Sequence, residues 1–168
     1  MNNLMIVSNW ASEALARRVA EALGQPFSEM VCRRFADGEQ YHAFPSDPGG
    51  RDLVIIGATH NDASHQELLD LIQGGRYNNA RTVNVVIPYL GHSTMERAKP
   101  DSNEIPKGIT RTRQIFRARP DFVAFVDLHS EAVLHAHGGE ISTYHIWSDE
   151  LAVAQIRESG LEDYVLVS

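Results

Sequence analysis

Short, continuous apolar runs separated by longer stretches of helical character are the feature that most limits what this chain can fold into. The runs occupy residues 4–7, 53–56 and 122–126, and Val83, Val85, Val86 and Ile87 form a fourth, interrupted by Asn84, within residues 82–87. Runs of four to six apolar residues are typical of strands covered on both faces, and such strands belong to parallel sheets. The sequence therefore predicts an alternating β-α-β-α-β order and an α/β fold with a mostly parallel sheet between flanking helices.

Helical spacing of apolar residues fills the gaps between these runs. It occurs at Leu15, Val19, Ala22 and Leu23, at Leu68, Leu69 and Ile72, and at Ile105, Ile109, Thr112 and Phe116. Ser12 is a candidate N-cap for the first helix and Gly24 its stop, and the second helix is expected to end near Gly74 and Gly75.

Two further regions carry weaker strand signals. Residues 25–33 and 40–44 flank the turn sequence at residues 35–39, which predicts a hairpin with an exposed or edge strand. Towards the C-terminus the pattern predicts a strand at residues 144–147, a helix at 149–159 and a closing strand at 164–168. Because no repeat, low-complexity tract or linker interrupts this order, we expect residues 1–168 to form a single domain.

Composition limits the classes of partner. The formal net charge of −7 and a pI near 5.5 argue against a sequence-independent nucleic-acid binder, which needs a basic face. Cys32 is the single cysteine, so no internal disulfide can form, and we expect a reducing cytoplasm and a Cys32 that packs as a small buried hydrophobe. Residues 4–7 are too short an apolar run for a signal peptide or a membrane helix, so neither export nor membrane partners are expected.

Charged residues gather directly after the strand predicted at residues 82–87. Pro88 ends the strand, Gly91 permits a sharp bend, and Glu96, Arg97 and Lys99 follow, with His92 before them. Ligands of open α/β sheets bind at the carboxyl ends of the strands. The stretch is therefore a candidate ligand site, although a solvated charged surface explains the same residues.

A second candidate follows the strand at residues 122–126. Asp127 and His129 come directly after it, at the same predicted edge of the sheet. An aspartate and a histidine there could bind a divalent metal or a triphosphate, and the structural alternative is a strand-end cap. A zinc site built from His129, His135, His137 and His145 is a further alternative, but their spacing fits no common zinc motif and a solvated loop is favoured.

Generic motifs do not decide the function. The sequence has no dinucleotide-binding glycine fingerprint, Walker loop, nucleophile elbow or Cys-x-x-Cys pair. It does carry three separated segments in order, at residues 35–39 (FADGE), 87–99 (IPYLG to ERAK) and 126–129 (VDLH). In these segments the chain resembles the N-terminal half of ribose-phosphate pyrophosphokinase, also called phosphoribosyl pyrophosphate synthetase, and the similarity spans essentially the whole chain.

The resemblance implies a type I phosphoribosyltransferase-like α/β fold. It also implies transfer of the pyrophosphoryl group of ATP, with Mg²⁺, to ribose 5-phosphate. By position, Phe35, Asp37 and Glu39 would belong to a loop that holds the adenine, supplied by a neighbouring subunit of a homo-oligomer. Glu96, Arg97 and His129 would bind ATP, with His129 also a metal ligand.

The chain departs from the family pattern in the loop after residue 91. Thr94 and Met95 stand where the family has an arginine and a glutamine, which removes a guanidinium suited to phosphate and an amide. The family's next metal-binding aspartate, its basic catalytic loop and its ribose-5-phosphate loop would lie beyond Ser168, in a C-terminal domain that this chain does not contain. No catalytic residue is assigned, and two readings stay open: part of an enzyme that is inactive alone, or a non-catalytic regulatory homologue that associates with synthetase subunits.

Overall fold

The central feature of the computed structural model, which describes residues 3–165 and residue 167, is a five-stranded parallel sheet. The strand order is β1-β4-β5-β6-β7, and each strand pairs in parallel with its neighbours. The strands span Leu4–Ser8 (β1), Asp52–Ile56 (β4), Thr82–Ile87 (β5), Phe122–Val126 (β6) and Ser142–Ile146 (β7). All four predicted apolar runs lie in this sheet, and the strand predicted at residues 144–147 begins two residues earlier.

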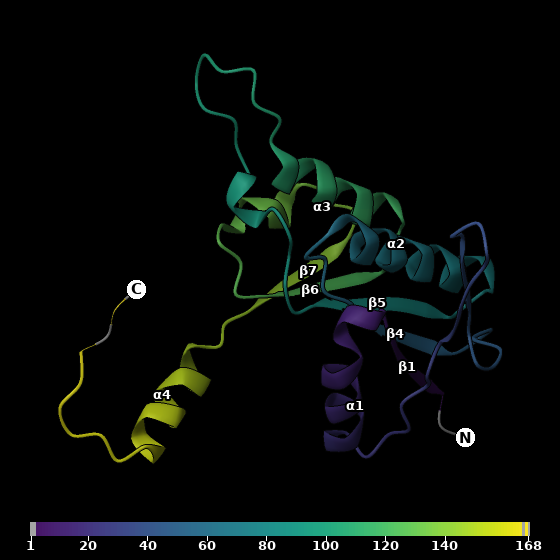
Figure 1. Cartoon of the computed structure of the whole chain (residues 1–168), viewed down its shortest axis with the longest axis horizontal. Helices are drawn as coiled ribbons and strands as arrows, with labels where there is room; N and C mark the ends of the chain where they lie inside the picture. The colour runs from purple at the N-terminus through teal and green to yellow at the C-terminus, as the bar shows by residue number, and fades with distance from the viewer. Residues whose placement is uncertain (1–2, 166, 168) are drawn as a thin grey trace.

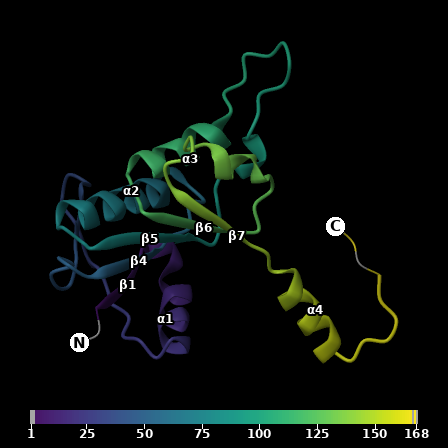
Figure 2. The same cartoon turned by 180° about the vertical axis from the view of Figure 1, so that it is seen from behind.

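Helices cover both faces of the sheet (Figures 1 and 2). Helix α1 (Glu13–Ala22) packs on one face through Ala16 and Ala20, against Ile6 and Ile56. Helices α2 (Asp62–Tyr77) and α3 (Lys107–Arg117) lie on the other face, where they bury the larger core. This is the three-layer α/β architecture that the alternating pattern predicts.

The alternation within β5 shows how one strand serves both layers. Val83, Val85 and Ile87 are fully buried in the larger core, whereas Val86 packs against the smaller core under α1. Burial of each such side chain contributes roughly 1.5–3 kcal/mol to the free energy of folding. The sheet is therefore the rigid element that sets where the following loops begin.

Three helices differ from their predicted form, and in the third Ile105, expected to be part of the apolar stripe, lies before α3 and is exposed. Helix α2 continues past Gly74 and Gly75 to Tyr77. Gly75 does not end the helix but lets it approach the sheet, because a Cβ there would lie 2.5 Å from Leu53 Cδ2. In α1 the buried residues are Ala16 and Ala20, while Leu15 and Leu23 are exposed. The helix thus approaches the sheet through small side chains, which apolar spacing alone does not indicate.

The predicted hairpin forms a separate two-stranded antiparallel sheet, with β2 at Val31–Arg34 and β3 at Gln40–Ala43. The first strand is shorter than the predicted residues 25–33. The expectation that Cys32 is buried was wrong: the side chain is exposed, because β2 pairs only with β3 and lies outside the main core.

The last helix, α4 (Asp149–Glu158), projects away from the sheet and has no buried residue (Figure 1). It confirms the helix predicted at residues 149–159. The closing strand predicted at residues 164–168 is not formed by Tyr164, Val165 or Val167, and Leu166 and Ser168 lie outside the described residues. None of the helices in the described part of the chain is both long and apolar enough to cross a membrane.

Candidate functional site

The loop after β5 is held against the loop after β4 by a close backbone approach. A Cβ on Gly91 would lie 2.0 Å from the carbonyl oxygen of Thr59, so glycine alone fits there. The Gly91 N–H donates to Thr59 Oγ1 at 3.0 Å, and the Thr59 N–H donates to the carbonyl of Tyr89 at 2.9 Å. The chain therefore leaves β5 in a fixed direction before it enters the charged segment.

The charged segment is fixed a second time at the start of α3. A Cβ on Gly108 would lie 2.8 Å from the carbonyl oxygen of His92 and 3.1 Å from Glu96 Cα. His92 adopts a left-handed backbone conformation, with φ of 61°, and the short 3₁₀ helix η2 (Ser93–Met95) follows. The segment from His92 to Glu96 thus rests directly on the first turn of α3.

This segment forms one wall of a cavity of about 1030 Å³. The opposite wall comes from the loop before α3 and from the residue that follows β6 by three positions. The lining residues that bear charge or an imidazole are Glu96, Arg97, Lys99, Glu104, Lys107 and His129. The structure therefore brings together Glu96, Arg97 and His129, as the sequence predicts, and joins Lys99 to them.

Ion pairs organise the charges of this cavity. Arg97 Nε lies 3.6 Å from Glu96 Oε1, and Lys99 Nζ lies 3.5 Å from Glu104 Oε1. The side chain of Glu96 is 11% exposed, whereas those of Arg97 and Lys99 are more than 80% exposed. Because the cations are free to move in solvent, they can turn from these carboxylates to an anion that enters the cavity.

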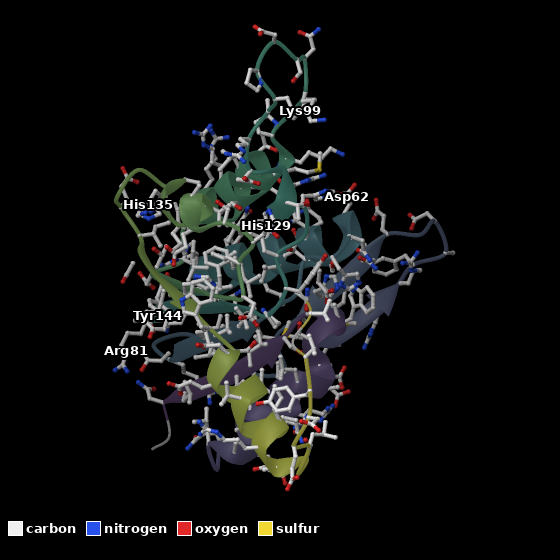
Figure 3. The ribbon with its side chains drawn as sticks, turned by 90° about the vertical axis from the view of Figure 1, so that its left-hand side faces the viewer. Asp62, Arg81, Lys99, His129, His135 and Tyr144 are labelled. Atoms are coloured by element: carbon white, nitrogen blue, oxygen red, sulfur yellow. The ribbon has the colours of Figure 1, made fainter. Side chains whose placement is uncertain are left out.

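His129 is exposed, and the backbone before it is held by a second histidine. The Leu128 N–H donates to His145 Nε2 at 2.8 Å, and His145 Nδ1 lies 3.1 Å from Glu131 Oε1. Since Nε2 accepts a hydrogen bond, the ring proton resides on Nδ1, facing the carboxylate. Figure 3 shows His129 below the projecting loop that carries Lys99.

The side chain of Asp127 makes different contacts from that of His129. Its carboxylate accepts hydrogen bonds from the Ser148 hydroxyl and from the backbone N–H of Ser148, the latter at 2.9 Å, and these bonds, the first most strongly, lower the pKa of Asp127. It does not line the cavity around His129. Of the two alternatives for this residue, the strand-end cap is therefore the one that the structure supports.

The predicted adenine-loop residues lie on the exposed turn between β2 and β3. Phe35 packs edge-to-face on Tyr41, and Asp37 Oδ1 accepts a hydrogen bond from the Glu39 N–H at 3.0 Å. None of Phe35, Asp37 and Glu39 lines the cavity around His129. Within one chain, the structure therefore does not bring these three residues to the other predicted ATP-binding residues.

The four histidines considered as a zinc cluster do not form one among the described residues. Both ring nitrogens of His145 are engaged, as given above. His137 Nδ1 accepts a hydrogen bond from the Gly139 N–H at 2.8 Å.

Sequence reasoning missed a group of buried polar side chains at the ends of β1 and β4. Asn9 donates to the carbonyls of Ala58 and Ser64, at 2.8 and 3.1 Å, and its Oδ1 has no hydrogen-bond partner among the described residues. Glu67 is 3% exposed, and burial raises its pKa to about 7. The available signals were a polar residue directly after the first strand and a glutamate beside the apolar stripe of a helix.

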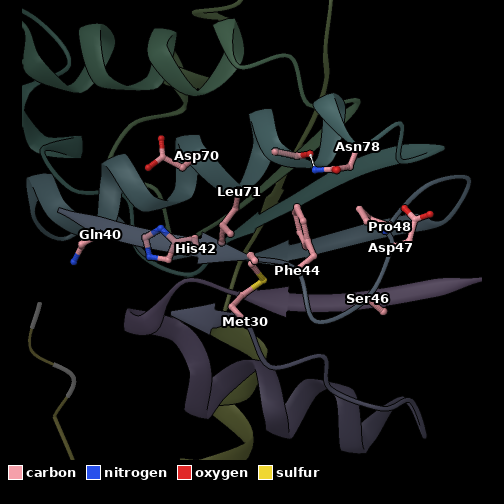
Figure 4. Close-up of a pocket in the computed structure, with 12 residues that line it drawn as sticks. Met30, Gln40, His42, Phe44, Ser46, Asp47, Pro48, Asp70, Leu71 and Asn78 are labelled. Carbon is pink, nitrogen blue, oxygen red and sulfur yellow. Dashed lines mark hydrogen bonds between the residues drawn. The ribbon is translucent and has the colours of Figure 1, made fainter. Parts of the chain in front are cut away.

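A second cavity, of about 730 Å³, lies between β3 and α2 (Figure 4). Its lining includes Met30, His42, Phe44, Asp70 and Leu71, drawn from the segment before β2, from β3 and its following loop, and from α2. The described residues that line this second cavity include no lysine or arginine. It therefore has fewer groups that could bind an anion than the cavity around His129.

Comparison with known proteins decides the family. Residues 4–109, well over half of the chain, match the family described as the N-terminal domain of ribose phosphate pyrophosphokinase. The chain belongs to the ribose-phosphate pyrophosphokinase family. The segment matched includes the β2–β3 turn and the whole of the charged loop between β5 and α3.

Individual members of the family match over most of the chain. It is 36% identical over 138 residues to a ribose-phosphate pyrophosphokinase of Thermoplasma acidophilum, covering 78% of the chain and 45% of that protein. It is 30% identical over 167 residues to one of Parasynechococcus marenigrum, covering 98% of the chain and 50% of that protein. The chain thus spans about half the length of the curated relatives it matches.

The fold agrees with that of a solved member of the family. The crystal structure of phosphoribosylpyrophosphate synthetase from Mycobacterium smegmatis matches with a TM-score of 0.81 and 23% sequence identity. The match covers 93% of this chain and 52% of that one. At this identity the likeness concerns the fold, which is that of the N-terminal part of a ribose-phosphate pyrophosphokinase.

Proposed function

We propose that this chain is the ATP-handling part of a ribose-phosphate pyrophosphokinase, and that ATP binds in the cavity around His129. The observation that carries the proposal is the meeting of Glu96, Arg97, Lys99 and His129 in one open cavity at the carboxyl end of the sheet. Arginine, lysine and imidazole groups are the side chains that recognise phosphates. Relatives of this chain are named for the reaction that the proposal assigns to the family.

In that reaction a ribose 5-phosphate hydroxyl attacks the β-phosphorus of ATP. A new bond forms between this oxygen and the β-phosphorus while the hydroxyl proton passes to water, and the bond from the β-phosphorus to the oxygen that bridges it to the α-phosphorus breaks, so that AMP leaves with that oxygen. Arg97 and Lys99 would hold the phosphates and offset their charge, and His129 would donate or coordinate next to them. Phosphoryl transfer depends on positioning and charge neutralisation more than on covalent participation of the protein.

The donor set fits magnesium that arrives with the nucleotide. Mg²⁺ keeps several water ligands and takes one or two protein ligands together with substrate phosphates. Glu96 supplies a carboxylate and His129 an imidazole in the same cavity. When bound, the cation would neutralise phosphate charge.

We further propose that the adenine is held by Phe35, Asp37 and Glu39 of a second copy of the chain in a homo-oligomer. Their exposure on the β2–β3 turn, away from the cavity of their own chain, supports this arrangement. Sedimentation equilibrium tests it, and a monomer at all concentrations would remove the shared site while leaving the phosphate contacts of one chain.

The direct test of the proposed function is calorimetry of Mg²⁺-ATP binding to the chain and to His129→Ala. A hydrogen bond to a charged group contributes about 1.5 kcal/mol or more, so we expect the variant to bind about tenfold more weakly. His135→Ala is the matched control, because His135 is an exposed histidine outside the cavity. Equal affinities of all three proteins would show that His129 only ends the strand.

A second candidate function is a regulatory homologue that associates with synthetase subunits. Thr94 and Met95, which line the cavity in place of an arginine and a glutamine of the family pattern, favour it. Turnover of ribose 5-phosphate by the intact protein separates the two functions. Oligomers mixed with a full-length synthetase, without detectable ATP binding by this chain, would support the regulatory function.

A further inference from the structure

Three side chains that bind transition metals meet where the β2–β3 hairpin lies against α2. Cys32 comes from β2, His42 from β3 and Glu67 from α2. One ligand atom from each lies within 4.8 Å of the others. This group lies apart from the cavity around His129, with which it shares no residue.

The hairpin itself places two of the three ligands. Cys32 and His42 are directly opposed in the antiparallel register, so their side chains project from the same face of the hairpin. His42 Nε2 lies 3.6 Å from Glu67 Oε1. The hairpin and the helix are thus already joined at this point by a pair of potential ligands.

Glu67 is the unusual member of the group, because a carboxylate is rarely buried without a cation. Its two oxygens each lie 3.2 Å from the Trp10 N–H, which donates to them. In the part of the chain that the structure describes, no lysine or arginine forms an ion pair with it, and the imidazole of His42 is the one basic side chain within 4.0 Å of its carboxylate. A bound divalent cation would supply the positive partner that this buried carboxylate lacks among the described lysines and arginines.

We propose that Cys32, His42 and Glu67 form a binding site for a zinc-like divalent metal ion. A thiolate, an imidazole and a carboxylate are all common zinc ligands, and water would complete a four-coordinate site. Ligand atoms 2.0–2.3 Å from a tetrahedral ion lie about 3.3–3.8 Å apart. His42 Nε2 and Glu67 Oε1, 3.6 Å apart, already have such a separation, and Cys32 Sγ lies within 4.8 Å of the other two ligand atoms, so rotation of its exposed side chain would bring it to the ion.

A metal at this site would fix the hairpin to α2. The hairpin carries the turn at Phe35, Asp37 and Glu39, so the ion would restrict the direction in which this turn projects. The metal site does not depend on the proposed ATP site, because its ligands and its test are separate.

The test is a titration of the metal-free chain with Co²⁺ as a spectroscopic substitute for zinc. We expect one Co²⁺ per chain, a thiolate-to-cobalt charge-transfer band in the near ultraviolet, and displacement of the band by one equivalent of Zn²⁺. Cys32→Ser should abolish the band, and its fold should persist because the side chain is exposed. His42→Ala and Glu67→Gln should each weaken binding at least tenfold.

His135→Ala is again the matched control, and it should bind Co²⁺ like the parent chain because His135 lies outside the group. Absence of the thiolate band in the parent chain would overturn the proposal, as would tight binding that survives His42→Ala. One metal per two chains would overturn it too, since that result would mean that exposed Cys32 residues of two copies share the ion.

Discussion

At the scale of single residues, the exposed pair Thr94 and Met95 is the sharpest departure from the family pattern in the proposed ATP site. Both line the cavity beside Glu96 and Arg97, so side chains at these positions can reach a ligand there. We expect Thr94→Arg with Met95→Gln to raise the affinity for Mg²⁺-ATP by about tenfold, through one added guanidinium contact of roughly 1.5 kcal/mol.

The measurement is calorimetry on the double variant and on a matched variant, Arg113→Gln with Thr94 and Met95 unchanged. Arg113 lies on α3 outside the cavity, so this control alters charge without altering the site. An unchanged affinity of the double variant would mean that these two positions do not limit nucleotide binding.

Individual residues also show which side chains of a site can be predicted from the sequence and which cannot. Glu96, Arg97 and His129 were identified through motifs that follow strands, and the sheet edge brings them into one cavity. Glu67 could not be identified in this way, since its partners Trp10 and His42 are distant in the sequence and only the packing of α2 joins them.

At the scale of elements, an ion pair ties the start of β4 to that of β5. The Asp52 carboxylate accepts from Arg81 Nε at 2.8 Å and from the Thr82 hydroxyl at 2.9 Å. The hydrogen bond from Arg81, and then that from Thr82, lowers the pKa of Asp52. Its stabilising effect is therefore complete above the unfolded-state pKa of about 4 and is lost as the pH falls through the lower folded-state pKa.

We expect Asp52→Asn to lower the urea midpoint of unfolding at about pH 7 and to lower it less at about pH 2. Asp47→Asn is the control, because Asp47 is an exposed aspartate whose carboxylate accepts from the backbone N–H of Gly49 instead of an arginine. Equal losses from Asp52→Asn at both pH values would show that the ionised carboxylate is not what stabilises the strand pair.

The helices and strands could be predicted where a short stretch of sequence shows by its apolar pattern that it is buried. Strands β4, β5 and β6 are buried in an uninterrupted or alternating pattern, and their apolar runs identify them. The end of α2 was not predictable, because Gly75 serves a contact with Leu53 that only the packed structure contains. Strand β2 pairs with β3 only from Val31 to Arg34, whereas Phe27, earlier in the predicted strand, forms an isolated parallel bridge with Ile6 of β1, and no local pattern indicates this change of partner.

At the scale of the whole molecule, the cavity around His129 and the β2–β3 turn lie on different parts of one chain. The family relation and the parallel three-layer fold are established, and the chain spans about half the length of its matched relatives. The resemblance in three short segments thus identified the correct family. Only the structure shows that the first of these segments lies away from the other two in one chain.

The most direct test of the central claim is to locate ATP on the folded chain by amide chemical-shift changes during an Mg²⁺-ATP titration. We expect saturable changes at Glu96, Arg97, Lys99 and His129, which share the cavity. Changes confined to the second cavity, at residues such as His42, or no saturable change anywhere, would contradict it.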